Sequence, residues 1–347
     1  MKVVSLSALR ADNPIGFLAA LGTLRLIENA RPEWQPKLQW LNQGFWSAAL
    51  TLVSDLSLDD VVSAITDQIA NRGNSLEFTW AKVIATTPAI FREHAAIAFN
   101  TARFDHRTSV DFFAAFGTEA ALSGSERLGR DRKIKPTQLC MTSGQMNFLE
   151  KIREVCKLLV QPRSADSTDL RATMTDALNG PWNYSDDQHS LFWDPTNEAI
   201  HALSAYDPSG KGKQTSMREV VYLAAESLSF FPVVSRKGKV RTTCFFTGED
   251  DEPRFHWPVW ECPLSHLTIR SLLQLAELEH PAKNELALNR RGVQAVFRSR
   301  RQSTGKDYGM FRPAEPFLTS LQPFFSPVDP YPTPLRTFEK RGLRADQ

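Results

Sequence analysis

A glycine- and lysine-rich loop in the second half of the chain, YDPSGKGKQTS, contains the residue types that bind phosphate groups. A nucleotide-binding P-loop has the pattern GxxxxGK followed directly by Ser or Thr. Here Gln214 follows Lys213, and Gly210 stands only two positions before Gly212, so that pattern is not met. The side chains of Lys211, Lys213 and Thr215 and the amides of the loop remain candidates for contacts to a nucleic-acid backbone.

The same loop also has a purely structural interpretation. Ser216 and Glu219 form the S-x-x-E pattern of a capping box, in which the serine hydroxyl accepts a hydrogen bond from the amide of the glutamate. On this interpretation the loop only starts the helix that follows it. The sequence leaves open whether the loop binds phosphate or caps a helix.

Three further groups of basic residues stand in a chain whose net charge is only +2. The first group is Arg127, Arg130, Arg132, Lys133 and Lys135, the second is Arg236, Lys237, Lys239 and Arg241, and the third is Arg290, Arg291, Arg298, Arg300, Arg301, Lys306 and Arg312. Aromatic residues lie within the third group, and aromatic rings beside arginines can stack on unpaired bases. Segregated charge on a nearly neutral chain favours an electrostatic binding surface, and ordinary solvated faces are the alternative.

Residues that could perform catalysis give a weaker signal. Two clusters have potential metal ligands, but neither has a spacing that specifies a metal site: Asp105, His106 and Asp111, and Asp186, Asp187 and His189. The four cysteines show no CxxC spacing, and no GxSxG sequence is present. We therefore expect no catalytic residue, no metal and no cofactor. The alternative is a metal-dependent nuclease that uses the first cluster.

The elements that would position these residues predict an α+β fold. Residues 3–9 read as a strand, Asn13 and Pro14 as the start of a helix, and the apolar run 15–27 as its buried body. Further helices are expected over 58–71, 88–103, 109–121, 144–160, 166–178 and 265–278, strands over 37–41 and 293–299, and a hairpin of 239–246 with 254–260 around the turn GEDDE.

The length of 347 residues and the change in character beyond Trp182 predict a division of the chain. We expect a mainly helical domain over 1–180, a mixed domain with basic loops over 181–312 and a proline-rich tail over 313–347. The run 15–27 is shorter than the roughly 20 residues that a membrane-spanning helix needs, so no membrane association is expected. Dispersed cysteines are typical of reduced thiols in a cytoplasmic protein.

Two stretches resemble subunits of type I-G (formerly I-U) CRISPR systems. The sequence DNPIGFLAALGTLRLIE is similar to the NPxGFLAALG opening of such subunits. The sequence YDPSGKGKQTSMREVVYLAAESLSFFPVV is similar to a segment in which a DPS–Lys–Thr stretch leads into an alanine-rich helix and an LxxFP turn. The matched positions are the turn Asn13-Pro14 and the loop residues Asp207, Ser209, Lys211, Lys213 and Thr215.

The resemblance implies a non-enzymatic protein, similar to a Cascade large subunit, in an antiviral crRNA-guided complex. It further implies contacts to the other Cascade subunits, to target double-stranded DNA near the PAM, and to the crRNA backbone. Such a protein needs basic side chains for phosphates, and one or two arginines that read guanine edges, because guide pairing reads the rest of the sequence. A purely structural scaffold, for which the basic groups are irrelevant, is a further alternative.

Overall fold

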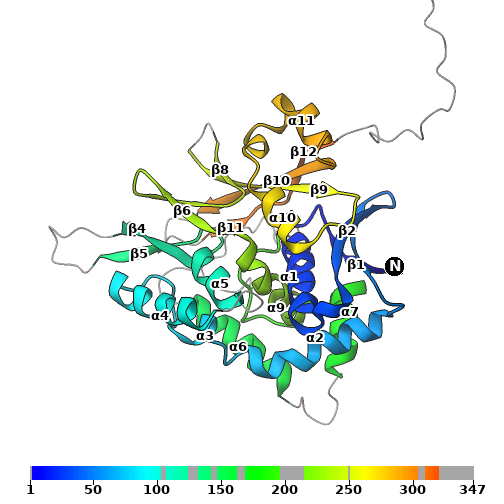
Figure 1. Ribbon diagram of the computed structural model, residues 1–347, viewed down its shortest axis with the longest axis horizontal. Coiled ribbons are helices and arrows are strands. Elements are labelled where there is room, and N and C mark those ends of the chain that lie inside the picture. Colours follow the sequence, from blue (N-terminus) through cyan, green and yellow to red (C-terminus); the bar gives the residue numbers. More distant parts are fainter. Residues whose placement is uncertain are drawn as a thin grey trace, which may run out of the picture.

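The computed structural model describes residues 2–102, 107–123, 132–141, 147–161, 169–195, 215–248, 251–303 and 309–319. The fold is α+β, as predicted, with small antiparallel sheets beside a larger helical part (Figure 1). None of the helices in these ranges is long and apolar enough to cross a lipid bilayer.

The chain begins with a three-stranded antiparallel sheet of order β1-β3-β2, built from β1 (Lys2–Arg10), β2 (Lys37–Asn42) and β3 (Trp46–Leu52). Strands β1 and β2 agree with the predicted ones. Strand β3 was not predicted, because its central Ala48 and Ala49 have low strand propensity and its place is decided by pairing on both sides.

Helix α1 (Pro14–Ala30) begins as predicted. The Asn13 side-chain oxygen accepts a hydrogen bond from the amide of Ile15 at 3.1 Å, and Pro14 occupies the first helical position. Every residue from Pro14 to Ile27 is buried, so α1 is a central helix of the core.

Helix α9 (Arg218–Glu226) packs directly against α1 in the middle of the molecule (Figure 1). A Cβ atom on Gly22 would lie 1.7 Å from the carbonyl oxygen of Leu223, so the close approach of the two helices requires glycine at this position. The two stretches that carry the family resemblance therefore form one helix pair. A single buried apolar cluster extends from this pair to both sides of residue 180, the expected domain boundary.

The helical part surrounds this pair. It consists of α2 (Leu58–Arg72), α3 (Leu76–Thr79), α4 (Pro88–Thr101), α5 (Thr108–Phe116), α6 (Phe148–Val160) and α7 (Leu170–Asn179). The prediction of one helix over 109–121 is wrong at its end. Helix α5 stops at Phe116, and Gly117 begins a strand that approaches the Lys135 carbonyl so closely that a Cβ atom would lie 2.9 Å away from that oxygen.

A five-stranded antiparallel sheet forms the opposite part. Its strands are β8 (Phe245–Thr247), β9 (Pro253–Trp260), β10 (Val293–Ser303), β11 (Gly309–Phe311) and β12 (Glu315–Thr319). The predicted tail thus contributes an edge strand, β12, and residues 320–347 lie outside the described ranges. The helix expected over 265–278 is shorter, because α10 (His266–Leu273) gives way to the 3-10 helices η4 (Ala276–Glu279) and η5 (Pro281–Lys283) and to α11 (Glu285–Asn289).

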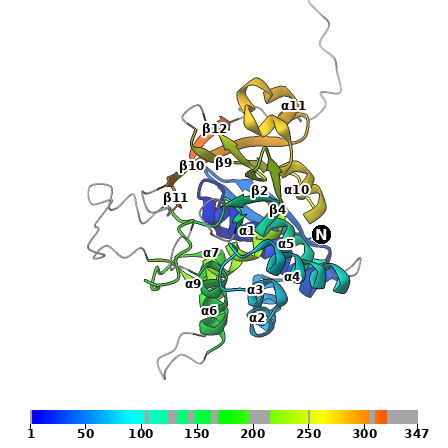
Figure 2. The ribbon, with the colours of Figure 1, turned by 90° about the vertical axis from the view of Figure 1, so that its left-hand side faces the viewer.

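Two two-stranded ribbons complete the fold: β4 (Gly117–Ser123) with β5 (Lys133–Pro136), and β6 (Val233–Arg236) with β7 (Lys239–Thr242). The predicted single strand 239–246 is therefore divided, because Cys244 has a left-handed φ of 66° and a turn separates β7 from β8. Only β8 pairs with β9 as expected. Both ribbons project from one side of the molecule, the left-hand side of Figure 1, which faces the viewer in Figure 2.

Candidate nucleic-acid interface

The structure brings the first and second basic groups together. Ribbon β4–β5 packs against ribbon β6–β7, where the Ser235 hydroxyl donates to the Ala120 carbonyl at 2.9 Å. The Lys135 Nζ atom lies 3.5 Å from the carbonyl oxygen of Gly238, at the tip of the other ribbon. We use the term ribbon surface for the side chains of Lys133, Lys135, Arg236, Lys237, Lys239 and Arg241.

Strand register places three of these cations on one face of ribbon β6–β7. Arg236 stands directly opposite Lys239, and Arg241 directly opposite Val234. Opposite residues of an antiparallel pair share a face, and residues two apart in a strand do so as well. Arg236, Lys239 and Arg241 therefore lie together, while Ser235 and Val240 occupy the other face, on which Ser235 contacts β4.

The turn of this ribbon exposes a fourth cation. Lys237 and Gly238 have φ values of 54° and 71°, as in the two-residue type I′ turn that fits the twist of a hairpin. Lys237 has a left-handed backbone conformation, and its side chain is exposed at the tip of the ribbon. The turn therefore extends the row of positive charge beyond the paired residues.

The charges of the ribbon surface are not compensated within the described part of the chain, where none of its six cations has a carboxylate partner. Like charges placed directly opposite each other, such as Arg236 and Lys239, destabilise a strand pair. Four of the six side chains are exposed, and Val234 beside Arg241 is 62% exposed. An arrangement that costs stability and attracts anions is a candidate binding surface.

The third basic group is different, because the protein itself compensates much of its charge. Arg291 pairs with Glu277 at 2.7 Å, Arg298 with Glu315 at 2.6 Å, and Arg300 with Glu252. The Arg298 guanidinium also lies over the ring of Phe317, 4.3 Å from its centroid. These three arginines are expected from the sequence to contact phosphates, and in the structure a carboxylate already engages each of them.

The remaining members of the third group lie apart. Arg301 follows Arg300 on β10, so its side chain points to the other face of the strand, where its Nη2 atom donates to the Cys140 carbonyl at 3.4 Å. Arg290 is exposed at the end of α11.

Other predicted site residues lie elsewhere in the chain. Arg132, of the first basic group, is exposed just before β5, next to the ribbon surface. Outside the described ranges lie Arg130, Lys211, Lys213 and Lys306.

The capping box predicted for Ser216 is wrong. Helix α9 starts at Arg218 with Met217 as its N-cap residue. Ser216 instead forms a β-bridge with Asp186, with N–O distances of 2.7 and 3.0 Å, and its buried hydroxyl has no hydrogen-bond partner. This bridge holds Ser216 in an extended conformation before the helix, and Thr215 stands half-buried beside it.

The turn Asn13-Pro14, matched in the resemblance, borders a hollow of about 580 Å³ at the start of α1. The Asn13 amide is engaged on both sides, since its oxygen caps α1 and its nitrogen donates to Asp194 at 3.2 Å. Arg10 and Asp12 form an ion pair at the same hollow, 2.5 Å apart. Asn13 therefore has a structural role in starting the central helix.

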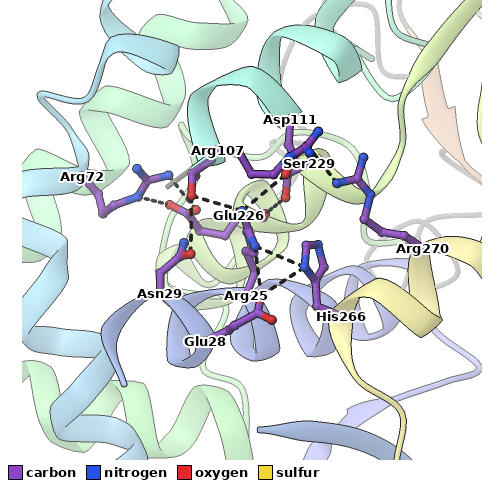
Figure 3. Close-up of polar contacts among 11 residues, drawn as sticks. Arg25, Glu28, Asn29, Arg72, Arg107, Asp111, Glu226, Ser229, His266 and Arg270 are labelled. Carbon is purple, nitrogen blue, oxygen red and sulfur yellow. Dashed lines mark hydrogen bonds and ion pairs between the residues drawn. The ribbon is translucent and has the colours of Figure 1, made fainter. Parts of the chain in front are cut away.

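In the first group of potential metal ligands, Asp111 is already surrounded by positive charge. Three arginines from different elements surround its buried carboxylate: Arg270 at 2.8 Å, Arg107 at 3.2 Å and Arg25 at 3.4 Å (Figure 3). Their positive charge disfavours a further cation at this position. Asp105 and His106 lie outside the described ranges.

The same region contains a second buried ion cluster around Arg72 of α2. Its guanidinium donates to both carboxylate oxygens of Glu226, each at 2.8 Å, and to Glu77 at 2.5 Å (Figure 3 shows Arg72 and Glu226). Burial raises the pKa of Glu77, but the charge of Arg72 and hydrogen bonds outweigh burial and lower it. The sequence analysis did not identify these two ion clusters. The signal that could have identified them is a charged residue within an apolar helix, such as Arg25 in α1 or Glu226 in α9.

In the second group of potential metal ligands, Asp186 and His189 belong to an ion-pair site that fixes the start of α9. The Asp186 carboxylate accepts hydrogen bonds from His189 Nδ1 at 2.8 Å, from the Gln188 amide at 2.8 Å and from Arg218. Burial raises the pKa of Asp186, but these hydrogen bonds hold it well below its usual range. Within the described ranges no three His, Cys, Asp or Glu side chains lie close enough together to hold a metal ion.

No protein-family model matches the chain, and no curated protein matches it either. The functional argument therefore depends on the geometry of the ribbon surface.

Proposed function

We propose that the protein is a cytoplasmic, non-catalytic nucleic-acid-binding subunit of a Cascade-type CRISPR effector complex. It contacts target DNA near the PAM, the crRNA backbone, or both, and it binds the other subunits of the complex. The observation that carries this proposal is the ribbon surface, with six cations that lack carboxylate partners in the described part of the chain. The resemblance of two stretches, which pack together as α1 and α9, supports the assignment to an effector complex.

The shape of the ribbon surface favours a polyanion over a single small anion. Alternate residues of a strand are about 7 Å apart, so Lys239 and Arg241 form part of a row and do not converge on one point. The turn residue Lys237 and the neighbouring Lys135 continue this row onto the second ribbon. A chain of phosphates can neutralise such a row along its length.

The test of this function is the salt dependence of binding. For duplex DNA, each phosphate contact adds about 0.9 to the slope of log affinity against log salt concentration, and about 0.7 for a single strand. We expect Arg236→Ala with Lys239→Ala to reduce the slope for a duplex by about 1.8, since two contacts are lost. The slope is measured by fluorescence anisotropy of a labelled duplex and a labelled RNA at salt concentrations between roughly 50 and 200 mM.

The matched control is Arg291→Ala, which removes an exposed arginine that is already paired with Glu277. We expect this variant to keep the slope of the wild-type protein. An unchanged slope in the Arg236 and Lys239 variant would exclude the ribbon surface as the contact. Absence of binding at low salt in the wild-type protein would contradict the proposed function and favour a structural scaffold.

A further inference from the structure

A hollow of about 310 Å³ opens directly beside the ribbon surface, between β7, β8 and the end of α10. The ribbon contributes Val234 and Arg241 to its wall, β8 contributes Phe246, and the end of α10 contributes Leu273 and Gln274. None of the residues that line it is acidic. Because Arg241 belongs both to the hollow and to the ribbon surface, a ligand on the ribbon can reach into the hollow.

Phe246 gives this hollow a half-buried aromatic ring. The ring packs against the imidazole of His256, with centroids 4.9 Å apart. His256 is in turn held by a hydrogen bond between its Nδ1 atom and the Leu278 carbonyl at 2.8 Å. Since its neighbour is fixed in this way, the Phe246 ring is a prepared platform on which a planar group can stack.

Arg254 lies next to Phe246 on the neighbouring strand of the sheet. Phe246 stands opposite Arg254 in the β8–β9 pair, and Arg254 stands opposite Arg300 in the β9–β10 pair. Opposite residues share a face, so these three side chains form a row across the sheet, in which Arg254 lies between Phe246 and Arg300, and the charge of Arg300 is paired with Glu252. A nucleic-acid strand that runs from the ribbon surface to this row passes over the hollow.

We propose that the hollow accepts one unstacked base of a single strand whose phosphates lie on the ribbon surface, with Phe246 as the stacking platform. This inference rests on the proposed function. Aromatic platforms beside cations are the usual means by which proteins bind unpaired bases. The exposed amide of Gln274 at the rim can donate to and accept from the edge of that base. A continuous duplex has no free base face, so the inference predicts a preference for single-stranded nucleic acid.

The experiment compares wild-type protein with Phe246→Leu, which removes the ring but keeps an apolar side chain. The probe is a labelled single strand with 2-aminopurine at one position, together with the same strand carrying an abasic site there and the corresponding duplex. We expect Phe246→Leu to bind the intact strand about tenfold more weakly than wild type. The salt slope should stay unchanged, and the abasic strand should bind both proteins equally.

The matched control is Phe317→Leu. Phe317 is also half-buried and also contacts His256, at 4.9 Å, but it does not line the hollow. This control should bind the intact strand as wild type does. Equal binding of that strand by wild type and Phe246→Leu would overturn the base pocket while the salt slope still supports the ribbon surface. Absence of any salt-dependent binding would instead contradict the proposed function itself.

Two further arms complete the test. Free 2-aminopurine nucleotide should bind at least a hundredfold more weakly than the strand, and binding as tight as that of the strand would overturn a strand as the source of the base. If Phe246→Leu does not fold, photocrosslinking of wild type to a strand with 5-iodouracil replaces it. A cross-link at Phe246 supports the inference, and cross-links confined to other segments overturn it.

Discussion

At the scale of single residues, the centre of the protein shows how buried charges are accommodated. Four arginines face four carboxylates there: Arg25, Arg72, Arg107 and Arg270, and Glu28, Glu77, Asp111 and Glu226. Most of these pairs join different elements, so the pairing fixes how the elements are oriented (Figure 3 labels all of these residues except Glu77). Removal of Arg72 would leave the buried carboxylates of Glu77 and Glu226 without their arginine, and such a loss typically costs about 3–5 kcal/mol.

The ribbon surface is the opposite case at the same scale. Its cations are solvated and have no carboxylate partners among the described residues, so they contribute little to folding. Residues of this kind can change without loss of the fold. The variants proposed for Arg236 and Lys239 should therefore weaken binding without loss of stability, and the removal of the like-charge pair should raise stability slightly.

His256 leads to a prediction on pH. Burial lowers its pKa from 6.5 to about 4, and its hydrogen bond to Leu278 only partly opposes this effect. Its buried Nε2 atom has no partner, so a proton there would be costly. As pH falls from 6.5 to about 4, the unfolded chain takes up a proton that the folded protein excludes. We expect the free energy of unfolding to fall by up to about 1.4 kcal/mol per pH unit in this window from this group.

Urea unfolding at several pH values between 4 and 7 measures this effect. His256→Gln cannot take up the proton, so its stability should depend less steeply on pH over the same window. His94→Gln changes a half-buried histidine on α4 and should keep the wild-type dependence. Parallel curves for wild type and His256→Gln would show that His256 is not the titrating group.

At the scale of elements, the approach of α1 to α9 makes a prediction about Gly22. A Cβ atom there would meet the Leu223 carbonyl at 1.7 Å, and backbone cannot move aside as a side chain can. We expect Gly22→Ala to lower the free energy of unfolding by about 1–3 kcal/mol or more, because the helices must separate. The midpoint of urea unfolding measures the loss.

Gly73→Ala is the matched control for this change. Gly73 also has a right-handed helical backbone, at the end of α2, but its Cβ atom would meet the Cβ atom of Cys156 at 3.0 Å and no backbone atom nearer than the Arg153 carbonyl oxygen, at 3.9 Å. We expect a clearly smaller loss, partly offset by the lower entropy of the unfolded alanine chain. Similar losses in both variants would show that the α1–α9 contact is not especially tight.

The sequence predicts the elements whose signals are local. Asn13 and Pro14 start α1, and the period of the apolar residues defines α2, because cap chemistry and periodicity act within a few residues. The switch from α5 to β4 at Gly117 depends on pairing with β5, and the division at Cys244 depends on a left-handed turn, so neither is visible locally. The two stretches that carry the resemblance form α1 and α9, and the close packing of these helices at Gly22 explains part of their sequence.

The candidate site is less predictable than the fold. The sequence identifies Arg236 and Lys135 as members of basic groups, but not that ribbons β4–β5 and β6–β7 lie side by side. It also includes the 290–312 group among the candidates, because a sequence does not show which arginines pair with distant carboxylates such as Glu252. Phe246 carries no signal at all, since its importance depends on the hollow beside it.

At the scale of the whole molecule, the core and the candidate interface are separate. Helices α1 and α9 lie in the centre, and the ribbons project from one side (Figures 1 and 2). The projecting ribbons can therefore contact a long ligand without disturbing the core. This separation is what a subunit needs if it binds nucleic acid while its body contacts neighbouring subunits.

The continuous core leads to a last prediction, on cooperativity. Helix α1 belongs to the expected first domain and α9 to the second, yet they bury each other and join one apolar cluster. A fragment of residues 1–180 would lack α9 and expose the buried face of α1, so we expect it not to fold alone. The full chain should unfold in one transition, with circular dichroism and tryptophan fluorescence coinciding. Trp80 and Trp257 are buried on either side of residue 180, so two separate fluorescence transitions would show that two domains fold independently.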